Sequence, residues 1–288
     1  MTVGIVTDGA ASLPEELARS LGVTVVPLEV SIGGRNASNG ERVPLDEVVR
    51  RLRDGVRTSS PPPGRFASAI ERGRRGGDGV LVLTVARSMS STYQAAALAA
   101  RRAGGDPGPV EVLDTRTAAG GQGLVVLAAA KAAQQGLPLP EVAAAARAAA
   151  ERVRLLATLD SLDQLVAGGR LPKAAGRLGA LFHVQPLFEF SHGAIRPRVP
   201  AFSRAGARRR ILRRWRRSRP HGPAALHVAA LHALAPKEAE SLLAAVRAEL
   251  GSEPATAFIG EFDAAMVAHT GPGLIGLAWW WEEGRPRG

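Results

Sequence analysis

The fold class of this 288-residue chain is decided by Val80-Leu81-Val82-Leu83-Thr84-Val85, a short apolar run that is followed by a helical segment at 92–103 and a second apolar run at 110–113. The two runs have the length and β-branched content of buried strands, and the segment between them has the length of a helix. The same order occurs upstream, with a strand at 3–6 and a helical segment at about 14–21. Strands that alternate with helices form a parallel sheet with helices on both faces. We therefore predict an α/β fold with a parallel sheet in the N-terminal part.

The pattern changes after about residue 154, where paired strands replace the regular alternation. Runs at 184–190 and 194–199 flank the turn Ser191-His192-Gly193, which predicts a β-hairpin. Paired strands mixed with helices indicate an α+β arrangement. We therefore predict two domains, an N-terminal α/β domain at 1–154 and a C-terminal α+β domain at 155–288, with the binding site between them.

Two further apolar runs are predicted to be strands. The run at 23–32 is apolar and β-branched, which is typical of one buried strand. The run Ala264–Ala268 stands directly before His269-Thr270-Gly271-Pro272-Gly273, and a strand there would deliver an imidazole into a glycine-rich turn. Glycine allows a ligand to approach the backbone closely. His269 is accordingly a candidate binding residue.

The composition excludes several kinds of site. The chain has no cysteine, so disulfides, thiolate metal ligands and cysteine nucleophiles are ruled out. Its six histidines have no metal-ligand spacing, so neither a metal site nor a bound cofactor is expected. The N-terminal residues lack the features of a secretory signal, and the longest apolar runs are too short to span a bilayer. We therefore expect a cytoplasmic protein.

The formal net charge of +11 is concentrated in one segment. Nine arginines lie between Arg204 and Arg219 with no acidic residue among them, and subtracting nine from +11 leaves +2 for the rest of the chain. The spacing of Ile211, Leu212 and Trp215 predicts one apolar helix stripe, with arginines on the other faces. A solvated helix surface is the simplest interpretation, while an acidic protein partner or an anionic membrane surface remains open. Interleaved aromatic residues are nearly absent, which argues against nucleic-acid binding.

Polar residues follow the predicted strands and should share one edge of the parallel sheet. Asp8, Ser90 and Asp114 each come shortly after a strand, and ligands of parallel sheets bind beyond that edge. Two hydroxyl clusters, Thr58-Ser59-Ser60-Pro61 and Ser88-Met89-Ser90-Ser91-Thr92-Tyr93, stand before predicted helices. Hydroxyl groups in this position cap helices, and helix starts also attract anions. The clusters therefore suit either capping alone or the binding of a small anionic head group.

A serine hydrolase or acyltransferase is the main alternative. It would use the hydroxyl group of Ser90 or Ser59 with the imidazole of His269. The chain has no G-x-S-x-G nucleophile elbow, and neither serine has the surroundings of a known nucleophile motif. We therefore favour binding without catalysis.

Six short motifs in order resemble the DegV family of bacterial fatty-acid-binding proteins over the whole length of the chain. They are Val6-Thr7-Asp8 with Leu13-Pro14, Thr58-Ser59-Ser60-Pro61 with Gly64-Arg65-Phe66, Ser90-Ser91-Thr92-Tyr93-Gln94, Leu162-Asp163-Gln164-Leu165 with Gly168-Gly169-Arg170, Gln185-Pro186 with Glu189 and Gly193, and His269-Thr270-Gly271-Pro272-Gly273. Three positions depart from the family pattern: Gly9 stands where the family has serine, Ser60 stands where glutamine is usual, and Phe202 lies where many members carry arginine.

The resemblance implies an apolar tunnel that holds one long-chain fatty acid such as palmitate. By motif, the carboxylate-binding residues would be Thr58, Ser59, Ser90, Arg170 and His269. Family members of this kind are carriers rather than enzymes, and they present the carboxylate to a separate fatty acid kinase that phosphorylates it. The resemblance therefore implies that the partners are a fatty acid and a kinase. From the arginine block we add a possible transient contact with an anionic membrane surface, and we expect no nucleic acid partner.

Overall fold

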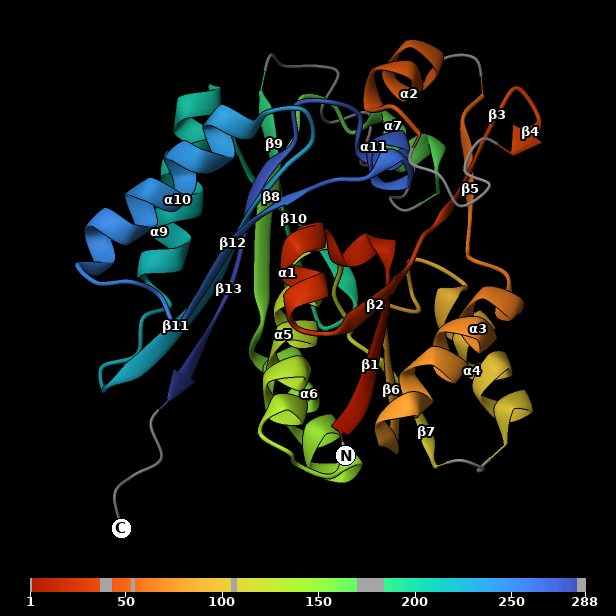
Figure 1. The fold of residues 1–288 in the computed structure, drawn as a ribbon. Helices are drawn as coiled ribbons and strands as arrows, with labels where there is room; N and C mark the ends of the chain where they lie inside the picture. Colours follow the sequence, from red (N-terminus) through yellow and green to blue (C-terminus); the bar gives the residue numbers. More distant parts are fainter. Residues whose placement is uncertain (1, 37–42, 53–54, 105–107, 170–183, 284–288) are drawn as a thin grey trace.

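The computed structural model describes residues 2–36, 43–52, 55–104, 108–169 and 184–283 (Figure 1). The first of its two large sheets has the strand order β2-β1-β6-β7, and all of its strands are parallel. These strands are β1 (Thr2–Asp8), β2 (Val23–Val26), β6 (Gly77–Thr84) and β7 (Val110–Asp114). The predicted parallel α/β arrangement of the N-terminal part is therefore confirmed.

The second sheet has six strands in the order β10-β9-β8-β13-β11-β12. Neighbouring strands are antiparallel except for β11 and β12. The strands are β8 (Arg154–Thr158), β9 (Gln185–Ser191), β10 (Ala194–Ala201), β11 (Ala224–His232), β12 (Thr256–Glu261) and β13 (Ile275–Glu283). The β9–β10 hairpin confirms the predicted turn at Ser191-His192-Gly193, whereas the division into domains at residue 154 stays a prediction.

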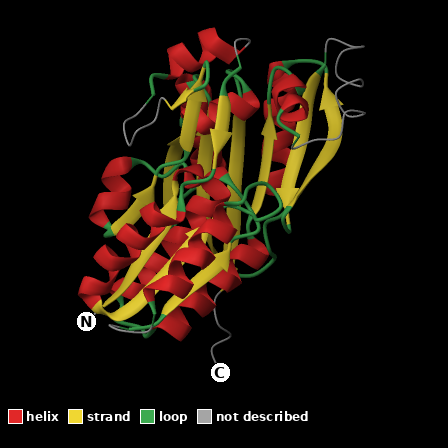
Figure 2. Cartoon of the chain, turned by 90° about the vertical axis from the view of Figure 1, so that its right-hand side faces the viewer, coloured by secondary structure: helices red, strands yellow, loops and turns green. Residues whose placement is uncertain are grey.

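Helices separate and cover the two sheets (Figures 1 and 2). Helices α3 (Pro63–Gly73) and α4 (Thr92–Ala103) pack on the outer face of the parallel sheet. Helices α5 (Ala119–Gln134) and α6 (Leu139–Arg152) lie between the sheets and contact strands of both. On the far side, α9 (Arg204–Arg216) and α10 (Pro236–Leu250) cover the outer face of the six-stranded sheet. The layers are therefore helix, sheet, helix, sheet and helix.

Small residues allow α5 to fit between the two sheets. Its sequence is rich in alanine and glycine, and nearly all of its residues are buried. A Cβ atom on Gly120 would come within 2.7 Å of the Cβ atom of Ala229 on β11. Real Cβ atoms do not approach so closely, so a larger residue at this position would push the layers apart.

The shorter elements gather at the carboxyl end of the parallel sheet. A three-stranded sheet is formed by β3 (Glu29–Ile32), β4 (Arg35–Asn36) and β5 (Arg57–Ser59). The helices α1 (Glu15–Ser20), α2 (Leu45–Arg51), α7 (Asp163–Ala167) and α11 (Ala264–Thr270) complete the fold. Both α2 and β5 contact α11, which places α11 between the small sheet and the rest of the molecule.

The prediction of one strand at 23–32 is wrong. Strand β2 ends at Val26, and β3 begins at Glu29 in a different sheet. Pro27 lies between them, and proline has no N–H group with which to continue a strand ladder. The chain therefore leaves the parallel sheet at this proline and enters the small sheet.

The prediction of a strand at 264–268 is also wrong, because this run forms α11. The Asp263 side chain accepts a hydrogen bond of 2.8 Å from the backbone N–H of Met266 and so caps the helix start. The run is rich in alanine, which favours a helix over a strand. The helix ends at Gly271, whose φ of +69° suits glycine. His269 is thus delivered by a helix rather than by a strand.

Candidate ligand-binding site

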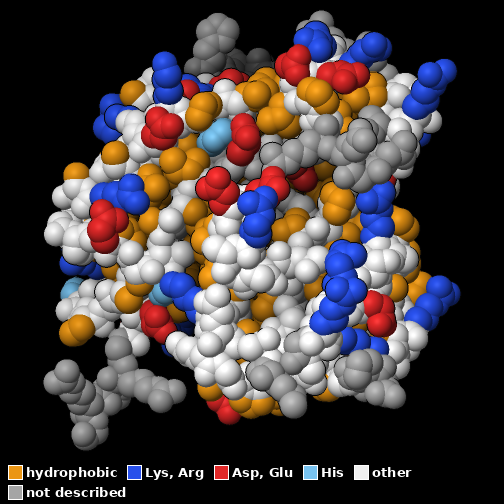
Figure 3. All heavy atoms as spheres, in the orientation of Figure 1, with side chains coloured by type: hydrophobic (Ala, Val, Ile, Leu, Met, Phe, Trp, Pro, Cys, Tyr) orange, Lys and Arg blue, Asp and Glu red, His pale blue; other side chains and the backbone are white. Residues whose placement is uncertain are grey.

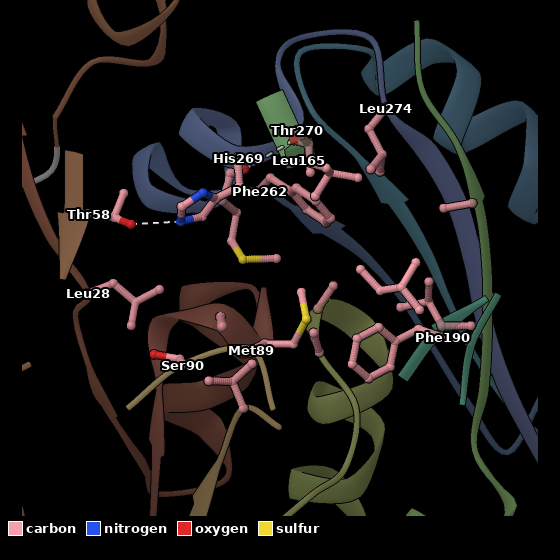
Figure 4. Close-up of a pocket in the computed structure, with 18 of the residues that line it drawn as sticks. Leu28, Thr58, Met89, Ser90, Leu165, Phe190, Phe262, His269, Thr270 and Leu274 are labelled. Carbon is pink, nitrogen blue, oxygen red and sulfur yellow. Dashed lines mark hydrogen bonds between the residues drawn. The ribbon is translucent and has the colours of Figure 1, made fainter. Parts of the chain in front are cut away.

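A cavity of about 310 Å³ lies between the two large sheets (Figure 4). Its walls are mostly apolar and come from both parts of the chain. The inner face of the six-stranded sheet contributes Leu155, Ala157, Phe188, Phe190 and Leu231. Ile195 on β10 belongs to the same sheet. Segments that follow the parallel strands, together with α7, α11 and their neighbours, contribute Ala10, Leu28, Val85, Met89, Ala118, Ala119, Leu165, Phe262, Met266 and Leu274. The cavity can therefore enclose an apolar chain.

One end of the cavity is polar. The Oγ1 atom of Thr58, on β5, lies 2.6 Å from Nε2 of His269, on the last turn of α11 (Figure 4). Thr58 is held in place because β5 pairs with β3, where its register partner is Val30. The hydroxyl group and the imidazole ring come from residues 211 positions apart in the sequence. The fold thus creates a cluster of hydrogen-bonding groups at the mouth of an apolar cavity.

The second hydroxyl cluster lies at the same polar end. The Oγ atom of Ser90 is 2.8 Å from Oγ1 of Thr92, and it accepts a hydrogen bond of 3.3 Å from the backbone N–H of Thr92. The Oγ atoms of Ser60 and Ser91 lie 2.9 Å apart, so this contact joins the two clusters. The three serines, Ser60, Ser90 and Ser91, line the cavity, whereas Thr92 does not. The serines therefore support the local backbone and also face a ligand site.

Four of the five residues expected to bind a carboxylate line this cavity. They are Thr58, Ser59, Ser90 and His269, whereas Arg170 lies outside the residues that the structure describes. Sequence reasoning missed the apolar walls. A period-two signal was present on β9, where Phe188 and Phe190 face the cavity and Glu189 between them faces the other way. Which apolar positions face a cavity rather than solid core depends on the packing of two sheets.

A buried carboxylate stands behind the cavity wall. The Asp8 side chain accepts a hydrogen bond of 3.0 Å from the N–H of Ala10 and one of 2.8 Å from the N–H of Val85, and both of these residues line the cavity. Burial raises the pKa of Asp8 to about 6, although these N–H groups and Gln122 oppose the increase. Asp8 therefore acts as a structural brace that fixes two segments of the wall.

The glycine at position 9 has a local explanation. A Cβ atom added to Gly9 would come within 2.8 Å of Oδ2 of Asp263, the residue that caps α11. The carboxylate of Asp263 thus lies against the backbone of Gly9. The departure from the family's serine at this position fits the close contact between the first sheet and the start of α11.

Two other kinds of structural feature, a metal-binding cluster and a membrane-spanning helix, are absent from the described residues. No three histidine, cysteine, aspartate or glutamate side chains among them gather in a way that would hold a metal ion. In the same residues, no helix is long and apolar enough to cross a membrane.

The fold and the site together define a class: a two-sheet α/β protein with an enclosed apolar cavity that is polar at one end. The sequence profile of a family described as "Uncharacterised protein, DegV family" matches residues 2–282. A DegV domain-containing protein from Streptomyces coelicolor is 35% identical over 280 residues, which are 96% of this chain and 97% of that protein. One from Deinococcus radiodurans is 34% identical over 96% of this chain and 98% of its own length. The chain belongs to the DegV family.

Solved structures of relatives share this fold, with alignments that cover nearly all of the chain. A DegV family protein from Thermus thermophilus, described as binding fatty acid, is 30% identical, with a TM-score of 0.83 over 97% of this chain and 99% of its own. DegV from Bacillus subtilis, described as a fatty acid binding protein, is 25% identical, with a TM-score of 0.83 over 98% of this chain and 100% of its own. A Thermotoga maritima protein described as revealing a fatty acid binding function is also 25% identical, with a TM-score of 0.82 over 97% of this chain and 99% of its own.

Proposed function

We propose that this protein is a carrier that holds one long-chain fatty acid, such as palmitate, in the cavity between its sheets. The observation that supports this proposal most strongly is the combination of apolar walls with hydroxyl and imidazole groups at one end. Burial of an acyl chain contributes about 0.8 kcal/mol per methylene group, so a long chain binds tightly without any covalent bond. Solved relatives described as fatty-acid-binding proteins share the fold.

The carboxylate is proposed to lie at the polar end. Burying a carboxylate is unfavourable unless it is paired and hydrogen-bonded. Thr58, Ser59 and Ser90 offer hydroxyl donors, and His269 offers a ring N–H group. Arg170 is proposed from its motif to supply the positive charge. A cation and several donors together match the two oxygens of a carboxylate.

Binding without catalysis is supported by the contacts of the hydroxyl groups. The hydroxyl group found next to the His269 ring belongs to Thr58, whereas Ser90 makes its described contact with Thr92. A serine nucleophile needs the histidine base within hydrogen-bond reach. The hydrolase that uses Ser90 or Ser59 with His269 is therefore the less favoured proposal.

We also propose that the carboxylate is presented to a partner acyl kinase. Ser59 and Ser91 line the cavity and are exposed to solvent, so the polar end reaches the surface of the protein. A kinase that docks there would reach the carboxylate while the acyl chain stays buried. The test is formation of an acyl phosphate by a candidate kinase, which we expect from the loaded carrier and not from the fatty acid alone.

The carrier proposal is tested by extracting purified protein under denaturing conditions and measuring lipid and intact protein by mass spectrometry. We expect about one free fatty acid per chain and an unmodified protein mass. His269→Ala should lower the amount of bound fatty acid, while the matched control His221→Ala, at an exposed position, should not. An acyl adduct on Ser90 or Ser59, or a protein without lipid that fails to take up palmitate, would contradict the proposal.

A further inference from the structure

Two large apolar side chains stand out on the surface next to α9. Phe202 is 85% exposed and lies between β10 and α9, and Val199, near the end of β10, is 73% exposed. The other exposed large apolar side chains in the described part of the chain, Val25 and Leu234, are exposed by 38% and 42%. Exposure of an aromatic ring to water is unfavourable relative to its burial. Large apolar side chains that gather on a surface therefore mark a site of contact with another apolar surface.

Unpaired arginines adjoin these side chains. Arg204, Arg214 and Arg216 form ion pairs with Glu238, Glu189 and Glu249, respectively. Arg209, Arg213 and Arg217 are exposed, and none of the described acidic side chains lies within ion-pair distance of them. Their spacing of four residues places them in one row along the helix. This row therefore carries three positive charges with no local compensation.

The apolar residues and the unpaired arginines share one surface. One hollow is lined by Phe202, Arg209 and Arg213, and a second by Val199, Arg213 and Arg217. The Arg210 side chain donates a hydrogen bond of 2.7 Å to the carbonyl group of Val199 and so ties the two segments together. We call the surface formed by Val199, Phe202, Arg209, Arg213 and Arg217 the docking face.

The start of α9, next to the docking face, is tied to the segment that follows β8. Arg204, the first residue of α9, lies 2.7 Å from Oδ1 of Asp160. The Asp160 carboxylate packs directly against Gly273, in the turn that follows His269. Arg204 and Asp160 thus link the start of α9 to the turn between His269 and β13.

We propose that the docking face binds an anionic lipid bilayer, with Phe202 and Val199 in the interfacial region and the three arginines on lipid head groups. Apolar side chains surrounded by cations are the pattern of interfacial membrane binding. Mobile head groups satisfy a row of arginines without a fixed arrangement of acids, whereas a protein partner would need one. The proposal rests on the carrier function, because a fatty acid carrier must collect its ligand from a membrane.

The experiment is co-sedimentation of the protein with phosphatidylcholine vesicles that contain or lack phosphatidylglycerol, at low and at high salt. Wild type should bind only the anionic vesicles, and high salt should weaken binding. Arg209→Glu with Arg213→Glu should weaken binding at least about tenfold, because basic residues near an anionic surface are attracted to it and glutamates are repelled. Phe202→Ser should weaken it by about tenfold through the loss of apolar burial. Arg101→Glu with Arg102→Glu, a matched pair of exposed arginines on α4, should bind like wild type.

Three outcomes would overturn the proposal. The first is equal binding of wild type to neutral and anionic vesicles. The second is a loss of vesicle binding in the α4 control pair as large as that in the docking-face variants. The third is binding of wild type to an acidic peptide such as polyglutamate but not to vesicles. Fatty acid content is measured in the same samples. Normal palmitate binding in all variants, with vesicle binding independent of the docking face, would refute the docking face and leave the carrier function intact. Vesicle binding that depends on the docking face, in a protein that holds no fatty acid, would refute the carrier function instead.

Discussion

The two faces of the six-stranded sheet are built by alternate residues of the same strands, yet they have opposite characters. On β9, Phe188 and Phe190 point into the cavity, while Leu187 and Glu189 point toward α9. On β8, Leu155 and Ala157 line the cavity, while Leu156 packs in the core beneath α9 and α10. Successive side chains of a strand point to opposite faces, so one short sequence serves both surfaces.

The difference indicates that the inner face of the sheet serves ligand binding and the outer face serves stability. The inner face is apolar and leaves space, which suits an enclosed ligand. The outer face is filled by helices and carries charges, including Glu189, which is 3% exposed and pairs with Arg198 and Arg214. Changes on the inner face should therefore alter ligand binding with little effect on stability, and changes on the outer face should do the reverse.

Filling the cavity from the inner face should have the largest effect. Ala157→Phe places a ring in the space proposed for the acyl chain. Exclusion of about five methylene groups, at about 0.8 kcal/mol each, removes about 4 kcal/mol of binding free energy, roughly a thousandfold in affinity. The measurement is palmitate titration of lipid-free protein, with Ala194→Phe at an exposed position of β10 as the control. Wild-type affinity in Ala157→Phe would show that the acyl chain does not use this space.

Asp8 lies behind the opposite wall of the cavity, and the titration of its carboxylate should make the stability of the protein depend on pH. The pKa of Asp8 is raised from 3.8 to about 6 in the folded protein, mainly because the carboxylate is buried. The folded state therefore binds this proton more strongly than the unfolded state, and the resulting stability is present below about pH 4 and lost as the pH rises through about 6. Asp8→Asn cannot titrate at this position.

The free energy of unfolding of wild type minus that of Asp8→Asn should therefore fall by up to about 3 kcal/mol between about pH 4 and pH 7. Urea unfolding at several pH values measures this difference. A difference that is constant with pH, or one that grows as the pH rises, would mean that the carboxylate is not in the buried environment described here.

Removing the buried charge on the outer face should change stability and not binding. Glu189→Gln leaves Arg198 and Arg214 without their carboxylate and should lower the free energy of unfolding by about 2 kcal/mol, since both arginines are partly exposed and solvent screens them. Glu253→Gln, which breaks an exposed ion pair with Arg247, should cost no more than about 0.5 kcal/mol. Palmitate affinity should stay at the wild-type value in both. A loss of palmitate affinity in Glu189→Gln alone would contradict the assignment of binding to the inner face and stability to the outer face.

Local patterns in the sequence predict most of the fold but not the space between its layers. The strand–helix alternation around 80–113 and the hairpin at Ser191-His192-Gly193 are confirmed because both depend on neighbouring residues. The strand predicted at 264–268 is wrong because Asp263 caps a helix at this point, and the hydrophobicity of the run is shared by buried helices and strands. The strand predicted at 23–32 is wrong because Pro27 interrupts the strand ladder within this run.

In the candidate site, too, the local pattern predicts the polar residues but not the apolar residues that line the space between the layers. The polar residues were found because hydroxyl clusters and the His269 turn are conspicuous in sequence, and the structure brings Thr58 and His269 within 2.6 Å. The apolar lining was not found, because Phe190 and Leu231 look like ordinary core residues until two sheets are placed on either side of a cavity. Long-range packing, and not local pattern, determines which apolar residues face empty space.

The most direct test of the account compares palmitic acid with its methyl ester in titrations of lipid-free protein. The two ligands share the acyl chain, and only the acid carries a charge for the polar end. Hydrogen bonds to a charged group contribute about 1.5–3 kcal/mol, so wild type should bind the acid at least about tenfold more tightly than the ester. This preference should shrink in His269→Ala and Thr58→Val, and persist in the control Thr24→Val, a partly exposed position on β2. Equal affinity of the wild type for acid and ester would contradict a carboxylate site at Thr58 and His269.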